Sequence, residues 1–261
     1  MPNAARHLTT IALAVFAAAI GAEAAAAAPC AFAPQGEGRV VAVIDARSFR
    51  LEDGREVRLA GIELAVQETR AGERARALAA IIAGREVRLS GLDDAPDRYG
   101  RQTAFVWLLP EETLVQGELL ARGEAIVSAD VPDRECAAFL LAGEAGSRGA
   151  KRGIWADAAA IKNTESGGAI LAGIGRLTLV EGKVLSVRQA GATTYLNFGR
   201  NWTRDFAVTI PRRSLADLAA AGLVPKSLEN KRIRVRGFVE ARPGPRIEVR
   251  QAAQIELLGE N

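Results

Sequence analysis

The sequence predicts an α+β protein dominated by β-barrels, with two five-stranded barrels in tandem. Two observations lead to this prediction. The order strand, strand, strand, helix, strand, strand occurs twice along the 261 residues, and a segment rich in glycine separates the two runs. The composition, 49% apolar and 25% charged, is that of a globular protein and excludes a disordered chain.

The first run of elements occupies residues 29–160. The predicted elements are, in order, strands at 39–44, 47–51 and 56–62, a helix at 73–82, strands at 86–89 and 101–109, and helices at 114–122 and 133–151. Asp53-Gly54 is a hairpin turn signal between two of the strands. Leu78, Ile81 and Ile82 recur at helical spacing in the first helix, and Gly84 ends it.

The second run occupies residues 176–261. It comprises strands at 177–187, 193–198 and 205–210, a helix at 214–221, strands at 232–239 and 246–249, and a closing piece at 254–258. Between the runs, residues 161–175 include Ser166-Gly167-Gly168 and predict a flexible linker.

Residues 1–28 predict a secretory signal peptide. Arg6 precedes an apolar run at 8–20, and small residues follow as far as Ala28. We therefore expect a periplasmic or secreted protein without a stable membrane anchor; an uncleaved anchor is the alternative. No other stretch is long and apolar enough to cross a bilayer.

Export determines how the two cysteines are interpreted. Cys30 and Cys136 form an even pair in an oxidising compartment, which predicts a disulfide, two unpaired thiols being the alternative. The single histidine, His7, lies in the signal segment. Histidine-based general-base, zinc and triad chemistry is therefore excluded from the mature chain.

Charge divides unevenly between the two predicted domains. Residues 29–160 carry 17 Lys and Arg against 21 Asp and Glu, a net charge of −4. Residues 176–261 carry 15 against 8, a net charge of +7. The basic second domain indicates a polyanionic partner.

Four passages in the first domain point to one family. They are Val43-Ile44-Asp45 with Ser48-Phe49-Arg50-Leu51, Val57–Ile62, Asp97-Arg98-Tyr99-Gly100-Arg101, and Val115–Gly123 with Gly153-Ile154-Trp155. In this order they resemble the thermonuclease (staphylococcal nuclease) family over about residues 39–155. The resemblance implies an oligonucleotide-binding (OB) barrel with helices, followed here by a second barrel of the same type.

The resemblance also implies a chemistry. In that family a calcium ion and two arginines grip a phosphodiester while a glutamate activates water. Preorganised cations neutralise the charge of the transition state, and the guanidinium does so through paired hydrogen bonds. The resemblance puts Arg58 and Arg101 at the two arginine positions and Tyr99 close to a bound nucleotide.

The remaining positions of the family's site are altered. Asp45 and Glu63 are the candidate metal ligands, and Glu63 stands at the family's second aspartate position. Arg47 stands where the family has a calcium-binding aspartate two residues after Asp45, and Leu64 replaces a threonine. The family's glutamate base is Val66 here, and Glu68 is a candidate substitute. A guanidinium beside a calcium site repels the ion, so we expect no cofactor, or Ca²⁺ if the nuclease site still functions.

Two interpretations of the arginines remain open. Arg47, Arg58 and Arg101 either form a metal-free cluster that holds a phosphate, or make ordinary ion pairs with neighbouring carboxylates. The carboxylates concerned are Asp45, Glu63 and Asp97.

The second domain offers a further candidate surface. Arg232, Arg234 and Arg236 alternate along one strand and predict a track for a nucleic-acid backbone. Tyr195 and Trp202 could extend that surface by stacking on bases. Solvated surface arginines, or a contact with another protein, are the alternatives.

The predicted function is an exported protein that binds nucleic acid or a similar polyanion through arginines, with weak or lost phosphodiester hydrolysis. An active endonuclease and an envelope scaffold that contacts another envelope protein are the two alternatives. Whether the chain is an enzyme is left open at this point, because fold alone does not decide function.

Overall fold

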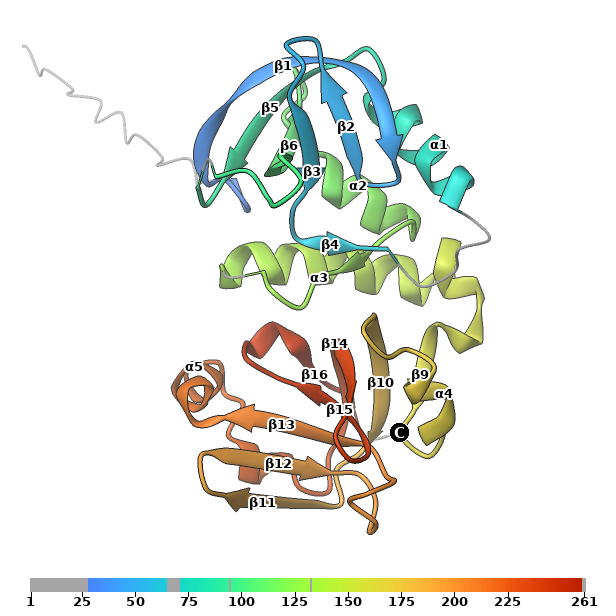
Figure 1. Cartoon of the computed structure of the whole chain (residues 1–261), viewed down its shortest axis with the longest axis vertical. Helices are drawn as coiled ribbons and strands as arrows, with labels where there is room; N and C mark the ends of the chain where they lie inside the picture. Colours follow the sequence, from blue (N-terminus) through green and yellow to red (C-terminus); the bar gives the residue numbers. More distant parts are fainter. Residues whose placement is uncertain (1–27, 65–70, 94, 132, 260–261) are drawn as a thin grey trace, which may run out of the picture.

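The computed structural model describes residues 28–64, 71–93, 95–131 and 133–259, which form two sheet-built halves with helix α3 (Arg134–Gly149) between them (Figure 1). The predicted signal peptide lies outside the described residues except for Ala28. Among the described helices, none combines the length and apolar character that a membrane span requires.

The N-terminal half is a closed five-stranded barrel. Its strands are β1 (Ala33–Asp45), β2 (Ser48–Leu51), β3 (Glu56–Leu59), β5 (Glu86–Gly91) and β6 (Gln102–Leu108). Residues 33–39 of β1 pair with β5 and residues 40–45 pair with β2, while the parallel pairing of β3 with β6 closes the barrel. The predicted α+β class and the barrel of this half are confirmed. We call this half the first barrel.

Short elements and helices surround the first barrel. They are β4 (Ile62–Glu63), α1 (Ala71–Ile82), β7 (Thr113–Leu114), α2 (Val115–Arg122) and β8 (Ile126–Val127), with 3-10 turns at Gly153–Ala156 and Ala158–Ala160. α2 ends at Gly123, whose φ of 72° is the left-handed conformation that terminates helices.

The C-terminal half is built on one sheet with the same order of pairing. Its strands are β9 (Ile161–Asn163), β10 (Leu177–Lys183), β11 (Ser186–Ala190), β12 (Thr193–Asn197), β13 (Ala207–Pro211), β14 (Arg232–Ala241), β15 (Pro245–Glu248) and β16 (Ile255–Leu257). The order is β11-β12-β13-β15-β14-β10, and β13 pairs with β15 in parallel, as β3 does with β6. Only Val184 and Leu185 separate β10 from β11. We call this half the C-terminal sheet.

Further short elements complete the C-terminal half. They are α4 (Gly167–Leu171), α5 (Leu215–Ala220) and 3-10 turns at Arg212–Ser214, Pro225–Leu228 and Ala252–Gln254.

The prediction of a flexible linker at 161–175 is wrong. β9 pairs in parallel with β10, α4 follows, and Ile170 is fully buried in the core of the C-terminal half. The apolar residues of this segment pack against the sheet, and its glycines form turns within an ordered structure.

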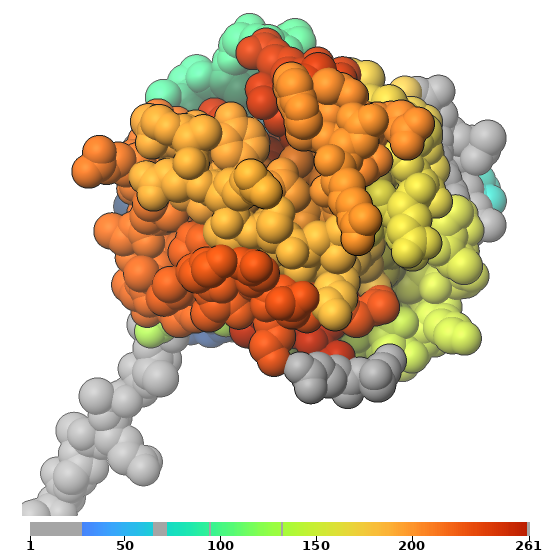
Figure 2. Space-filling model, turned by 90° about the horizontal axis from the view of Figure 1, so that it is seen from below, coloured from blue at the N-terminus to red at the C-terminus, as the bar shows by residue number. Residues whose placement is uncertain are grey.

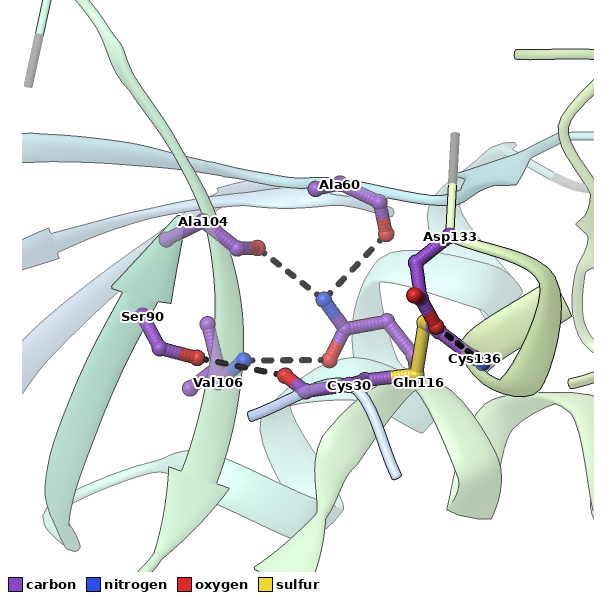
Figure 3. The surroundings of a disulfide bond; sticks show 8 residues. All are labelled: Cys30, Ala60, Ser90, Ala104, Val106, Gln116, Asp133 and Cys136. Carbon is purple, nitrogen blue, oxygen red and sulfur yellow. Dashed lines mark hydrogen bonds between the residues drawn. A yellow bond between two sulfur atoms is a disulfide. The ribbon is translucent and has the colours of Figure 1, made fainter. Parts of the chain in front are cut away.

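The predicted disulfide between Cys30 and Cys136 is confirmed, with a Cα–Cα distance of 4.6 Å. It joins the beginning of the described chain to the first turn of α3. Beside it, the fully buried Gln116 accepts a hydrogen bond from Val106 N and donates to the carbonyls of Ala60 and Ala104 (Figure 3). This side chain therefore ties α2 to β6 and to the end of β3.

A buried ionic network joins α3 to the C-terminal sheet. Glu144 and Arg236 are 0% and 1% exposed and form two hydrogen bonds of 2.9 Å. Arg148, Arg234 and Glu256 extend the network. Burial alone would lower the pKa of Arg236, but Glu144 and Glu256 outweigh burial and raise that pKa above its ordinary value.

An apolar cluster lies beside the network and completes the contact between the halves. Its buried members are Ile126, Ile154, Trp155, Leu177 and Leu179. Ionic and apolar contacts are therefore both buried between the two halves, and the halves form one body.

Candidate functional site

A pocket of about 370 Å³ opens on the first barrel where the altered family positions meet. Arg47 follows the end of β1, and Arg58 lies on β3. Strand β2 pairs with β1 on one side and with β3 on the other, which brings the two arginines to the same pocket. The segment from Leu59 to Glu63 forms one wall. Asp93, after the barrel strand β5, and Asp130, after β8, which pairs with β4, also line the pocket.

Inside this pocket Arg47 binds Glu63. Arg47 Nη1 lies 2.5 Å from Glu63 Oε1 and 2.8 Å from the carbonyl oxygen of Ile62. The two side chains are 12% and 25% exposed, so the pair is largely shielded from water. The backbone N–H of Arg47 donates to Asp45 Oδ1 at 2.8 Å.

These residues do not fit a calcium ion. The guanidinium of Arg47 already occupies an oxygen of Glu63 and puts a positive charge where the ion would sit. Asp45 Oδ1 caps its own turn. Within the described part of the chain, no group of three or more His, Cys, Asp or Glu could hold a metal ion. We therefore derive no chemical step through calcium.

Arg101 is held by Asp97. Its Nε and Nη2 lie 2.9 Å and 2.7 Å from Asp97 Oδ2. The hydrogen bond from the Arg101 side chain holds the pKa of Asp97 below its ordinary value, and the same bond raises the pKa of Arg101. Asp97 lines the pocket, so the pair stands at its edge.

Tyr99 lies in the turn that carries this pair. Its ring is 66% exposed, with the guanidinium carbons of Arg98 and Arg101 at 4.8 Å and 5.0 Å from its centroid. The turn is fixed because Asp97 Oδ1 accepts the backbone N–H groups of Tyr99 and Arg101. The structure therefore presents an aromatic face beside the pocket.

Arg58 differs from the other two arginines. It is half-buried on β3 and lines the pocket, and no carboxylate among the described residues pairs with it. Its guanidinium is thus available to an anion. The ion-pair interpretation holds for Arg47 and Arg101, and the phosphate-holding cluster stays a prediction.

The candidate base Glu68 lies outside the described residues, as does Val66 at the family's base position.

Three residues that line the pocket were not predicted from the sequence: Asp93, Ser128 and Asp130. Asp93 follows the barrel strand β5, and Ser128 and Asp130 follow β8, which pairs with β4 next to Arg58's strand. Only these non-local pairings bring them near Arg58, and no local pattern marks them.

The predicted nucleic-acid track along β14 is wrong. Arg236 is 1% exposed and bound to Glu144, and Arg234 is bound to Glu181 and Glu256. Arg232 is exposed at the start of the strand. The alternation of the strand was read correctly, but α3 packs on the arginine face through Glu144, and the neighbouring strand β16 supplies Glu256 as a partner.

Tyr195 and Trp202 lie together in a separate groove of the C-terminal sheet, away from Arg234 and Arg236. The groove measures about 790 Å³ and is lined by strands β11, β12 and β13 and by two loops. The structure thus brings these two candidates together and separates them from the arginine row.

Comparison with known proteins bears on the first barrel. Residues 56–157 match the family model described as staphylococcal nuclease homologue. No curated protein matches the chain. The matched segment runs from β3 to the turn after α3 and includes Arg58, Glu63 and the Asp97–Arg101 passage.

Proposed function

Since residues 56–157 form a thermonuclease-like domain, we propose that the protein binds nucleic acid or a similar polyanion at the first-barrel pocket and has weak or lost phosphodiester hydrolysis. The observation that carries this proposal is the ion pair between Arg47 and Glu63 inside the pocket.

Binding is supported by the arrangement of positive charge. Arg58 is open to the pocket, and Arg101 stands at its edge with Tyr99 beside it. An arginine binds a phosphate through two parallel N–H groups, and an aromatic ring offers a face to a base. Arg101 retains N–H groups that Asp97 does not use, since its two hydrogen bonds to Asp97 come from Nε and Nη2.

Weak hydrolysis is supported by what the pocket offers as a base. Hydrolysis needs a carboxylate that removes a proton from water at the phosphorus. Glu63 is neutralised by Arg47, and Asp97 is engaged by Arg101. A valine occupies position 66, where the resemblance expects the base.

Export of the protein is supported by the disulfide. Bonds of this kind form and persist in oxidising compartments, and Cys30 and Cys136 are paired. Together with the signal-like residues 1–28, this favours a periplasmic or secreted protein.

One observation favours a second candidate, an active phosphodiesterase. Asp93 and Asp130 line the same pocket as Arg58, so a carboxylate other than the family's glutamate could take the role of base.

The test is cleavage and binding by the mature chain, residues 29–261. Single-stranded oligonucleotides are incubated with calcium or with a chelator, and dinucleotide binding is measured by calorimetry at low salt. We expect no cleavage in either condition, and weaker dinucleotide binding by Arg58→Ala. Arg50→Ala is the matched control, because Arg50 is exposed on β2 and pairs with Glu56 outside the pocket.

Two results would decide against the proposal. Calcium-dependent cleavage that disappears in Arg58→Ala would establish the active enzyme. Dinucleotide binding that is equal in the wild type and Arg58→Ala would remove the first-barrel pocket as the binding site.

A further inference from the structure

The groove of the C-terminal sheet has a floor set by strand register. On β11, β12 and β13, Arg188, Tyr195 and Thr209 are cross-strand partners in one row. A second row joins Ser186 to Asn197, two residues along each strand and therefore on the same face. Figure 2 shows this end of the molecule, where orange surface near residue 200 and red surface near residue 240 border a hollow.

The floor carries hydrogen-bonding side chains. Asn197 Nδ2 donates to Ser186 Oγ at 3.2 Å, and Thr209 and the small Ala207 lie beside them. These groups offer hydrogen bonds along a groove whose rim also carries apolar side chains, among them Leu185 and Pro243.

Arginines surround this floor without matching carboxylates. Arg188, Arg200 and Arg242 are exposed, and none of the described carboxylates pairs with them. Arg246 lies 3.5 Å from Glu240. Asp205 is the carboxylate among the lining residues, and its Oδ2 accepts the backbone N–H of Asn201. The unbalanced positive charge therefore selects a polyanion.

The groove also presents an aromatic pair. Trp202 is 72% exposed, whereas Tyr195 is half-buried in the floor. The loop around Trp202 is ordered, because Asn201 Oδ1 accepts hydrogen bonds from the backbone N–H and the hydroxyl of Thr203. A Cβ on Gly244 would lie about 3.1–3.2 Å from the backbone of this loop, so the two loops that border the groove are packed against each other. An ordered loop thus holds a large aromatic ring in water.

We propose that this groove binds single-stranded nucleic acid, with the arginines on the phosphates and Trp202 and Tyr195 stacked on bases. Stacking needs bases whose faces are free, so a single strand fits and a duplex does not. This goes beyond the proposed function, because it places a second site in the other half of the chain and does not require the first-barrel pocket.

The test uses the tryptophan itself as the probe. The chain has three tryptophans, and Trp107 and Trp155 are only 4% and 6% exposed. We expect an oligothymidine of about 12 nucleotides, within the usual site size of such folds, to quench the fluorescence of the mature protein. Trp202→Phe should lose the quenching and keep its affinity within about threefold, because phenylalanine still stacks, whereas Trp202→Ala should bind about tenfold more weakly.

Arginine variants distinguish binding in the groove from general electrostatic attraction between the basic half and the oligonucleotide. Arg188→Ala with Arg242→Ala should weaken binding and reduce its salt dependence. Arg212→Ala with Arg213→Ala is the matched control, since both arginines are exposed on the same half and lie outside the groove. Thermal melts verify that each variant is folded.

Three results would overturn the proposal. They are equal affinity of the wild type and of a Tyr195→Ala, Trp202→Ala double variant, equal affinity for a duplex of the same length, and binding of polyphosphate as tight as that of the oligonucleotide.

Arg58→Ala distinguishes this site from the first-barrel pocket, because it should leave the quenching of Trp202 unchanged. Quenching lost in Arg58→Ala and kept in the arginine double variant would also place all binding in the first barrel.

Discussion

At the scale of single residues, arginines do three different things in this protein. Arg236 joins the two halves through Glu144, Arg47 neutralises Glu63, and Arg58 faces an open pocket. The residue type alone does not distinguish these roles, because they depend on which carboxylate folding brings within reach.

The pair of Glu144 and Arg236 leads to a stability prediction. Arg236→Met leaves the carboxylate of Glu144 fully buried with only the half-buried Arg148 and the backbone N–H of Val127 as described partners, so the free energy of unfolding should fall by about 3–5 kcal/mol. Urea denaturation measures the change. Arg232→Met, on the exposed start of the same strand, should change it by less than about 0.5 kcal/mol.

A second variant distinguishes the loss of charge compensation from a packing defect caused by the methionine. Arg236→Met combined with Glu144→Leu removes both charges and should be more stable than Arg236→Met alone. If the double variant is the less stable of the two, the cost does not come from an unpaired buried charge.

Arg47 leads to a prediction about calcium. Arg47→Asp replaces the positive charge by a carboxylate and releases Glu63, so calcium should raise the melting temperature of the variant and leave the wild type unchanged. Arg50→Asp adds the same charge outside the pocket and should show no such effect. Calcium stabilisation of the wild type would contradict our assignment of the Arg47–Glu63 pair.

At the scale of elements, helix α3 is bonded to both halves of the protein. Its first turn carries Cys136, bound to Cys30, and its last turns carry Glu144 and Arg148, bound to the C-terminal sheet. The helix is thus attached covalently at one end and ionically at the other.

The disulfide should contribute strongly to stability. It closes a loop of 106 residues, and the chain-entropy model assigns such a loop about 4–5 kcal/mol. A reductant should therefore lower the urea midpoint of the wild type and leave the double variant Cys30→Ala, Cys136→Ala unchanged. If both proteins respond alike to the reductant, the destabilisation does not arise from this bond.

Most strands and helices could be predicted from the sequence, because their apolar spacing and turn signals are local. β1 begins at Ala33, six residues before the predicted start, since its first part is fixed by pairing with β5. The segment 161–175 was misassigned for the same reason, as its glycines are visible in the sequence but its pairing with β10 is not. The candidate site shows the same limit, because Arg58 could be recognised by motif, whereas Asp93 depends on closure of the barrel and Asp130 on the pairing of β8 with β4.

At the scale of the whole molecule, the contact between the halves should depend on pH. Burial alone would raise the pKa of Glu256, but Arg236, Arg148 and Arg234 outweigh burial and hold it below its ordinary value of 4.5. A lowered folded pKa means that the stabilisation is complete above the ordinary value and is lost as the pH falls through the folded one.

This gives a measurable pH profile. The difference in the free energy of unfolding between the wild type and Glu256→Gln should be large at pH 7 and should shrink as the pH falls below the ordinary value of 4.5. Glu86→Gln, at an exposed pair with Arg39, provides the control and should change little across that range. A difference that stays constant with pH would exclude Glu256 as the group responsible.

The buried pair between the halves also has a consequence for how such sequences can diverge. Glu144 and Arg236 lie 92 positions apart, and loss of either charge alone leaves the other buried with an incomplete set of partners. Related chains that keep both halves should therefore change these two positions together, whereas the exposed Arg39 and Glu86 are free to change separately.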